Sequence, residues 1–101
     1  MHWLWTWKGK FFGYRDGDNL WTFRGAHVGR FHGDEIYDHQ GCYLGEIKSD
    51  NRLITNRSKS GWRKAAFGKQ ARRTSFARFA NYAAFAMYAG YEDFPTLDEV
   101  N

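Results

Sequence analysis

The sequence predicts a mainly β protein of one domain: four 16-residue β-hairpin repeats in a pseudo-fourfold meander ring or shallow barrel, plus one C-terminal α-helix. The first observation is a Gly-x-x-φ-Gly pattern, with φ apolar, that recurs every 16 residues at 9–13, 25–29 and 41–45. The second is the segment 75–90, where aromatic residues fall at every third position among alanines. Because a fixed period marks one repeated supersecondary unit, the period predicts the architecture before any residue suggests a function.

Each unit begins with a strand signal and ends with a turn signal. The strand signals, rich in apolar and aromatic residues, lie at 4–6, 20–22, 36–38 and 52–54. The turn signals, Gly-Asp twice and then Ser-Asp, lie at 17–18, 33–34 and 49–50. Such pairs supply the positive φ angles of tight hairpin turns. One unit is therefore strand, turn at the first glycine, strand and second turn, so that four units predict eight short antiparallel strands.

The glycines of the repeat have structural roles in this interpretation. They are Gly9, Gly13, Gly25, Gly29, Gly41, Gly45 and Gly61. The second glycine of each unit lies inside a strand, where glycine usually marks a bulge or a sharp bend. Four equivalent bends predict a sheet that curls around a pseudo-fourfold axis, and closure would remove exposed edges. The fourth unit departs most from the pattern, with Arg52, Arg57 and Ser60 in place of an apolar residue, glycine and an apolar residue.

The C-terminal third divides into three predicted parts after a ring domain at 1–64. These parts are a basic connector at 65–74, an aromatic and alanine-rich helix at 75–90 and an acidic tail at 91–101. Ser75 is a suitable N-cap, Gly90 a suitable C-terminal stop, and alanine favours helix. A period of three carries the aromatic residues around the axis of a helix of 3.6 residues per turn, so such a helix needs apolar contact on most sides.

The predicted strands supply a surface for this helix. Adjacent positions such as Leu4 and Trp5 are both apolar in three consecutive units, although they point to opposite faces of the sheet. A sheet that is apolar on both faces must be covered on both. We expect the core of the ring to cover one face and the helix, packed on or beside the ring, to cover the other. Packing against a second subunit and insertion into a membrane interface remain alternatives for the helix.

The repeat resembles the four-fold β-flower domain, a bacterial family. The residues that carry the resemblance are 25–38, 41–47 and 89–95, together with the spacing of the glycines. The resemblance implies the fold and says little about activity, since fold alone does not specify function. The family's own likeness to membrane-associated tubby-type barrels is a likeness of fold.

Charge is distributed unevenly along the chain. The formal net charge is +4, yet nine basic residues and no acidic residue lie between Asn51 and Tyr91. This block predicts either contact with phosphate, on lipid headgroups or nucleic acid, or a solvated connector. The candidate anion-binding residues are Arg63, Lys64, Lys69, Arg72, Arg73 and Arg78. The candidate aromatic interface residues are Trp62, Phe67, Phe76, Phe79, Tyr82, Phe85 and Tyr88.

Residues with catalytic or metal-binding chemistry are mostly explained by the repeat. His27 occupies the position of Phe11 and Tyr43, which favours a half-buried ring over a metal ligand. Asp18, Asp34 and Asp50 recur with the period, as turn residues do. Cys42 has no partner that the pattern fixes, and the serines lack a nucleophile-elbow motif. We therefore expect no enzyme, cofactor, metal or small-molecule substrate.

Three functions follow as alternatives. The first is a non-enzymatic binding or adaptor module that contacts an anionic membrane surface through the basic segment and the aromatic residues. The second is RNA or DNA binding by the same segment. The third is a self-assembling structural protein, a homo-oligomer with the aromatic helix as its interface. The single cysteine and an N-terminus unlike a signal peptide predict a cytoplasmic location, the membrane periphery included.

Overall fold

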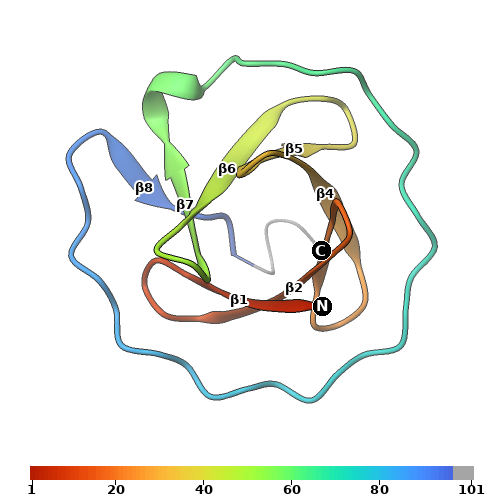
Figure 1. Ribbon diagram of the computed structural model, residues 1–101, viewed down its shortest axis with the longest axis horizontal. Helices are drawn as coiled ribbons and strands as arrows, with labels where there is room; N and C mark the ends of the chain where they lie inside the picture. The colour runs from red at the N-terminus through yellow and green to blue at the C-terminus, as the bar shows by residue number, and fades with distance from the viewer. Residues whose placement is uncertain (97–101) are drawn as a thin grey trace.

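Seven strands of the chain form a closed ring in the computed structural model, which describes residues 1–96 (Figure 1). The strands are β1 (His2–Thr6), β2 (Phe11–Asp16), β3 (Asn19–Thr22), β4 (His27–His32), β5 (Glu35–Asp38), β6 (Tyr43–Lys48) and β7 (Arg52–Asn56). Neighbours along the chain pair antiparallel, and β1 pairs parallel with β7 through Trp5 opposite Arg52. A parallel junction is required because an up-and-down meander with an odd number of strands brings its first and last strands together in the same direction.

The fourth hairpin is incomplete, so the prediction of eight strands from four full units is corrected. After β7 the chain forms a short 3-10 helix, η1 (Arg57–Lys59), and leaves the sheet. The eighth strand is instead β8 (Tyr91–Asp93), which pairs antiparallel with the last three residues of β7, Ile54 to Asn56. Since β1 pairs only with the first two residues of β7, β8 occupies the part of that strand's edge that β1 leaves free.

The predicted bends are present at the second glycines of the first three units, Gly13, Gly29 and Gly45. The fourth predicted bend is wrong, because Gly61 lies in a turn after η1 and outside any strand. The ladder shifts register next to them, between Leu4 and Trp5, Leu20 and Trp21, and Ile36 and Tyr37. A Cβ atom on Gly13 would overlap the carbonyl oxygen of Trp21 on the neighbouring strand. Glycine therefore allows adjacent strands to approach closely enough for the sheet to curl into a ring.

One extra turn residue explains why Arg52 stands at the position where the other units carry an inward apolar residue. The pairs Asp16–Asn19 and His32–Glu35 each enclose a two-residue turn, whereas the pair Lys48–Arg52 encloses three residues. The insertion moves β7 by one position, and in a strand a shift of one residue exchanges the two faces. Leu53 therefore joins the inward column of Leu4, Leu20 and Ile36, while the Arg52 side chain contacts the segment outside the ring.

The predicted helix at 75–90 is wrong, and so is the boundary between a connector and a helix. Residues 64–90, which we call the belt, have no helical hydrogen bonds and run extended around the outside of the ring (Figure 1). Three residues per turn is the period of a polyproline-type extended chain, so aromatic residues at every third position can face the ring along the whole belt. Alanine and the cap residues favoured a helix locally, but the hydrogen bonds of the belt are made to the ring.

Belt and ring are joined by two series of backbone hydrogen bonds. In the first, the N–H groups of Lys64, Arg73 and Tyr82 donate to the carbonyls of Gly41, Gly25 and Gly9 over 2.8–2.9 Å. In the second, the N–H groups of Phe67, Phe76 and Phe85 donate to the carbonyls of His39, Phe23 and Trp7 over 2.8–3.0 Å. The belt thus advances nine residues for every 16 of the ring and runs in the opposite sense. This match of periods covers the outer face of the sheet.

The inner face is closed by the C-terminal segment. The core contains Leu4, Phe12, Leu20, Val28, Phe31, Ile36, Leu53 and Phe94. Phe94, 1% exposed, follows β8 into the ring and packs edge-on against Phe12 with ring centroids 5.2 Å apart. Part of the predicted acidic tail is therefore strand and core, and the rest, 97–101, lies outside the described residues.

Candidate anionic-surface interface

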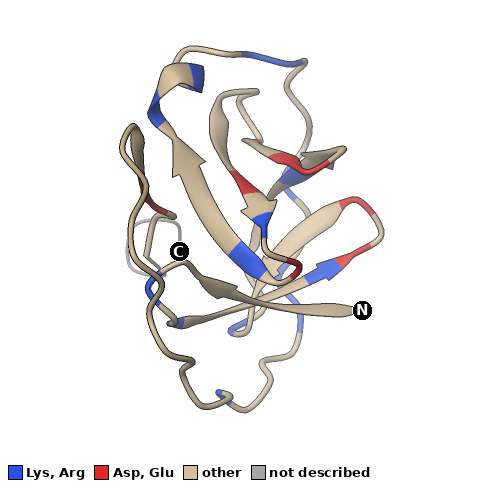
Figure 2. Ribbon diagram, turned by 60° about the vertical axis from the view of Figure 1, so that its left-hand side comes forward, with Lys and Arg blue, Asp and Glu red and all other residues tan. Residues whose placement is uncertain are grey.

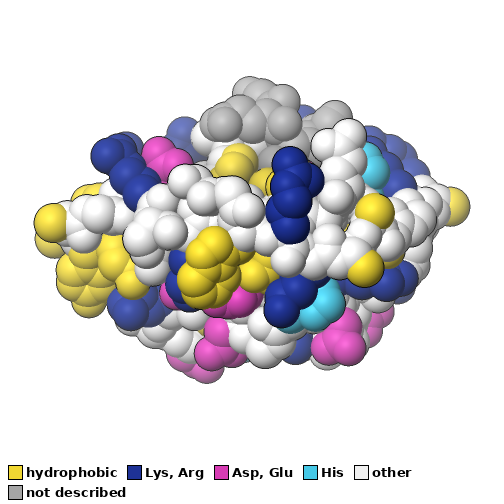
Figure 3. All heavy atoms as spheres, turned by 90° about the horizontal axis from the view of Figure 1, so that it is seen from above, with side chains coloured by type: hydrophobic (Ala, Val, Ile, Leu, Met, Phe, Trp, Pro, Cys, Tyr) yellow, Lys and Arg dark blue, Asp and Glu magenta, His cyan; other side chains and the backbone are white. Residues whose placement is uncertain are grey.

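The two ends of the ring differ in charge. Alternate turns of a meander lie at opposite ends, so the turns at Gly9, Gly25 and Gly41 share one end, which we call the belt end. Asp18, Asp34 and Asp50 lie in the turns at the other end. Figure 2 shows most acidic segments in the hairpin turns beside the N-terminus, and Figure 3 shows acidic side chains gathered along one edge. The fold thus separates charges that alternate along the sequence.

Most of the predicted anion-binding residues lie exposed on the belt or, for Arg63, directly before it. Among residues 1–96, no carboxylate forms an ion pair with the following five side chains: Arg63, Lys64, Lys69, Arg72 and Arg78. They follow an arc and do not form one cluster. Arg72 donates to the carbonyl of Arg24 over 3.0 Å, and this brings a ring cation beside the belt.

Arg73 differs from the other predicted anion-binding residues. Its guanidinium forms a 2.8 Å ion pair with Asp16 and lies 3.9 Å from the centroid of the Trp21 ring. The hydrogen bond to Asp16 raises the pKa of Arg73. These contacts fasten the belt to the wall of the ring, so Arg73 is a structural cation.

Five predicted aromatic residues are exposed at every third position of the belt, and we call them the aromatic arc. Its members are Phe76, Phe79, Tyr82, Phe85 and Tyr88, which are 39–49% exposed. Their inner sides pack on ring aromatics: Tyr82 stacks on Trp5 at 3.9 Å, and Phe79 on Phe11 at 4.9 Å between centroids. The indole N–H of Trp5 also donates to the carbonyl of Ala80 over 2.9 Å. One side of each arc residue is thereby held in place while the other faces outward.

The remaining two aromatic candidates lie outside the arc. Phe67 is partly buried beneath Arg30, whose guanidinium carbon lies 4.4 Å from the ring centroid. Trp62 is 48% exposed and lies near the ammonium of Lys59, 5.2 Å from its ring centroid. Both therefore contact cations that lie outside the belt, on β4 and in η1.

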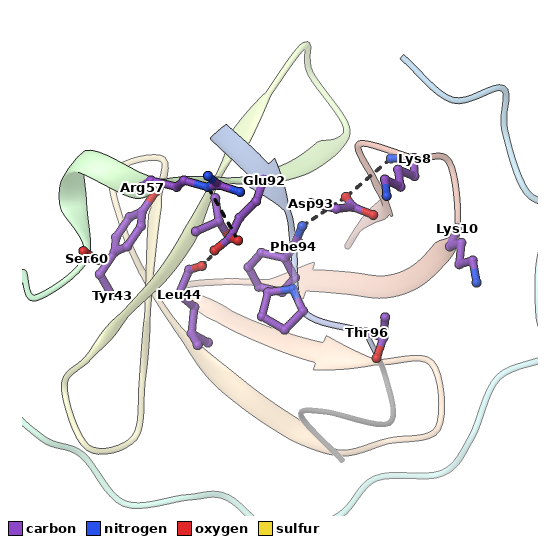
Figure 4. A pocket seen from close by; sticks show the side chains of 12 residues that line it. Lys8, Lys10, Tyr43, Leu44, Arg57, Ser60, Glu92, Asp93, Phe94 and Thr96 are labelled. Atoms are coloured by element: carbon purple, nitrogen blue, oxygen red, sulfur yellow. Dashed lines mark hydrogen bonds and ion pairs between the residues drawn. The ribbon is translucent and has the colours of Figure 1, made fainter. Parts of the chain in front are cut away.

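A cleft of about 850 Å³ opens beside β8 at the belt end (Figure 4). Leu44, Phe94 and Pro95 supply apolar walls, and Lys8, Lys10 and Arg57 supply cations. Two acidic side chains temper this charge: Glu92 lies 3.7 Å from Arg57, and Asp93 accepts a 3.4 Å hydrogen bond from the backbone N–H of Lys8. A smaller cavity of about 230 Å³ includes Lys10, Arg24 and Arg78.

The sequence interpretation missed the three ring cations of the belt end, Lys8, Lys10 and Arg24. In sequence they lie in a half of the chain that is nearly neutral, so its net charge concealed them. The repeat could have revealed these three cations. Each lies next to the first glycine of its unit, and the turns at these glycines all lie at one end of the meander.

A network of two short ion pairs fastens η1 to the ring. Lys59 donates to Glu35 over 2.7 Å and to Glu46 over 2.8 Å. These hydrogen bonds raise the pKa of Lys59, and the bond from Lys59 lowers that of Glu35. Burial raises the pKa of Tyr43, whose hydroxyl donates to Glu46 over 2.8 Å. The network stabilises the exit of the chain from β7.

The four histidines are not gathered into one site. Within the described residues, no group of three His, Cys, Asp or Glu side chains is arranged to hold a metal ion. His2, His32 and His39 are exposed, whereas His27 is buried and hydrogen-bonded at both ring nitrogens.

Comparison with known proteins identifies the family from the ring and the belt together. No curated protein and no solved structure matched the chain. The model of the family described as 4-fold beta flower protein matches residues 1–91, which include β1 to β7, the whole belt and the first residue of β8. This match covers more than half of the chain, and the protein therefore belongs to the 4-fold beta flower family.

Proposed function

We propose that this protein is a non-enzymatic binding module that docks on an anionic membrane surface through its belt. The observation that carries the proposal is the continuity of two features on one segment, the exposed basic residues at 63–72 and the aromatic arc at 76–88. Aromatic rings are favourable at the membrane interface. Each Lys or Arg near an anionic surface adds about 1 kcal/mol, a contribution that salt screens.

The charge separation supports one orientation of the ring on such a surface. The belt end carries Lys8, Lys10 and Arg24 beside the belt, while Asp18, Asp34 and Asp50 lie at the other end. Approach by the belt end keeps these carboxylates away from anionic headgroups. The cleft beside β8 opens on the same end and offers room for a headgroup. No helix among the described residues is long and apolar enough to cross a bilayer, and peripheral contact requires none.

The test is sedimentation with vesicles of anionic or neutral lipid at two salt concentrations. We expect binding to anionic vesicles that weakens as salt rises. The triple variant Arg63→Gln, Lys69→Gln, Arg72→Gln should partition about a hundredfold more weakly at low salt, since three cations near the surface contribute about 3 kcal/mol. Failure of the unchanged protein to pellet with anionic vesicles at low salt would refute the proposal.

A matched control separates orientation from net charge. The variant Asp18→Asn, Asp34→Asn, Asp50→Asn raises the net charge by three at the opposite end, whereas the first variant lowers it by three. Oriented docking predicts little change in vesicle binding, whereas attraction governed by net charge predicts a clear increase. A gel-shift with single- and double-stranded RNA and DNA runs in parallel. A shift without vesicle binding would favour the nucleic-acid function, and concentration-dependent sizing without either would favour self-assembly through the aromatic arc.

A further inference from the structure

His27 lies buried between the ring and the basic part of the belt, with 2% of its surface exposed. The backbone N–H of Gln70 donates to its Nδ1 over 2.9 Å, and its Nε2 lies 2.9 Å from Oδ1 of Asn19. A backbone N–H can only donate, so Nδ1 must carry no proton. The proton of the neutral ring is therefore on Nε2 and is donated to Asn19. This arrangement requires neutral His27, because the protonated ring has no acceptor for Gln70.

The groups around His27 oppose a positive charge. The Trp21 ring on β3 and the Phe67 ring on the belt lie 4.9 and 5.6 Å from it between centroids. Burial lowers the pKa of His27, and Arg30 on its own strand with Arg73 and Lys69 on the belt lower it further, although a hydrogen bond with the Gly29 backbone acts in the opposite direction. Of these cations, Arg73 is itself paired with the carboxylate of Asp16.

We propose that His27 is a pH-sensitive latch whose protonation releases the basic segment 67–73 of the belt from the ring. The bond to Gln70 lies midway between the anchors at Phe67 and Arg73, whose N–H groups donate to His39 and Gly25 over 3.0 and 2.8 Å. Protonation removes this bond and adds repulsion from Lys69 and Arg73. The segment that opens carries Lys69 and Arg72, two of the cations of the proposed membrane contact. Acid would therefore let these two side chains extend further toward an anionic surface; this last consequence rests on the proposed function.

The latch is particular to the second unit of the ring. Its repeat position is held by Phe11 in the first unit and by Tyr43 in the third, and neither ring changes charge between pH 5 and 8. In the first unit the ring supplies the donor and the belt the acceptor, because the backbone N–H of Phe11 donates to Oδ1 of the belt residue Asn81 over 3.1 Å. Acid should therefore loosen one part of the belt and leave the aromatic arc attached.

The test combines NMR titration of the His27 ring with amide hydrogen exchange, both without membranes. We expect the protection of the Gln70 amide, corrected for the intrinsic exchange rate, to fall on acidification, up to about tenfold for each unit by which the His27 pKa is depressed. The Phe76 amide, bonded to Phe23 beyond the latch, is the internal reference and should keep its protection. An unchanged Gln70 protection after His27 has titrated, or a His27 that stays neutral to pH 4, would overturn the latch.

Two variants complete the test. His27→Phe, the residue of the first unit, should expose Gln70 to exchange at all pH values and abolish the pH dependence. His39→Gln, which removes an exposed histidine whose side chain makes no bond to the belt, should retain it. A pH dependence that survives in His27→Phe would assign the effect to another group and overturn the proposal. In the vesicle assay, acid-enhanced binding that His27→Phe lacks would connect latch and membrane; a latch seen by exchange without that effect would refute only the connection.

Discussion

Arg52 is a buried cation without a carboxylate partner among the described residues. It is 4% exposed, donates to the carbonyls of Trp7 and Ala83 over 3.2 and 2.9 Å, and lies 3.9 Å from the centroid of the Phe85 ring. Its Nε atom has no hydrogen-bond partner. Burial lowers the pKa of Arg52, yet a guanidinium remains charged at any ordinary pH. Carbonyl oxygens and an aromatic face thus stabilise the charge and fasten the belt where the ring closes.

We expect Arg52→Ala to lower the free energy of unfolding by about 2–4 kcal/mol, because it removes two charge-assisted hydrogen bonds and a buried cation–π contact. Arg52→Lys should recover less than half, since an ammonium cannot reproduce the planar fork. Chemical denaturation measures both. Arg57→Ala is the control, an exposed arginine 3.7 Å from Glu92, and should change stability by less than about 0.5 kcal/mol. Equal losses at the two positions would contradict this role for Arg52.

Gly25 combines two requirements in one residue. Its φ is 92°, and a Cβ atom there would overlap the carbonyl oxygen of Arg73 on the belt. Gly17 has a φ of 59° but nothing within 4 Å of a Cβ atom. We therefore expect Gly25→Ala to cost about 3 kcal/mol or more and Gly17→Ala about 1 kcal/mol in thermal or chemical unfolding. Similar losses of unfolding free energy in the two variants would show that the contact of Gly25 with the belt adds nothing to its need for a positive φ angle.

The conformation of the belt is determined by its hydrogen bonds to the ring. In the part of the chain that the structure describes, no backbone hydrogen bond joins two residues of the belt, and its shape follows from hydrogen bonds to successive ring turns at intervals of nine residues. Most belt residues are exposed, but the indole N–H groups of Trp5 and Trp7 donate to Ala80 and Ala86 over 2.9 Å each. The side of the belt that faces the ring is fixed by these bonds, whereas its outer side is exposed. Such a segment is suited to contact with a second surface.

The end of the belt returns to the sheet, and this return depends on Phe94. We expect Phe94→Ala to destabilise the protein by about 3–5 kcal/mol, because it leaves a cavity in the core beside Phe12 and Gly45. Amide exchange should also show early opening of β8 and of the neighbouring belt. Glu92→Ala, exposed on the same strand, is the control and should have an effect within about 0.5 kcal/mol. A small effect of Phe94→Ala would mean that the ring holds its core without this side chain.

At the scale of the whole molecule, ring and belt enclose each other's apolar surfaces. The ring has one core inside and a second aromatic layer between its outer face and the belt. The chain makes a circuit of the ring before β8 completes the sheet (Figure 1). The termini of the belt are thus both anchored in the same sheet, and we expect ring and belt to unfold together.

The stability of this assembly should fall in two steps on acidification. The pKa of His27 lies below its ordinary value of 6.5, so its contribution is complete above pH 6.5 and is lost as pH falls from there. The pKa of Glu35 lies below its ordinary value of 4.5 because Lys59 donates to it, so this second contribution is lost as pH falls below 4.5. Melting temperatures measured across this range should show both steps. His27→Phe should remove the first and Glu35→Gln the second; one unaltered step in both variants would contradict the assignment.

Much of the ring was predictable from the sequence, and the belt was not. The 16-residue period and the glycines predicted a curled meander of hairpins, because turn and bulge chemistry is local. The conformation of 75–90 depends on carbonyl groups more than 40 residues away, such as that of Phe23. Local sequence patterns that favour a helix carry no information about such distant acceptors. The period of three was the contrary signal, since it fits an extended chain better than a helix.

For the candidate interface, the sequence supplied the residue types and the fold supplied their neighbours. Exposed cations and aromatic residues of the belt were foreseen, but Arg73 could not be recognised as structural before Asp16 and Trp21 were seen beside it. Lys8, Lys10 and Arg24 could also have been predicted as part of the interface, because alternate turns of a meander lie at the same end of the sheet.

The sequence by itself determined the repeat, the turns, the bends and the family, because each depends on residues close together in the chain. Only the tertiary structure decided that the fourth hairpin is replaced by β8, that Arg52 faces outward and that the aromatic segment is a belt. These outcomes depend on one added turn residue and on hydrogen bonds between distant segments. A one-residue shift exchanges the two faces of a strand, and an extended segment takes its shape from the groups that it binds. The orientation of Arg52 and the path of the belt therefore do not follow from local conformational preferences.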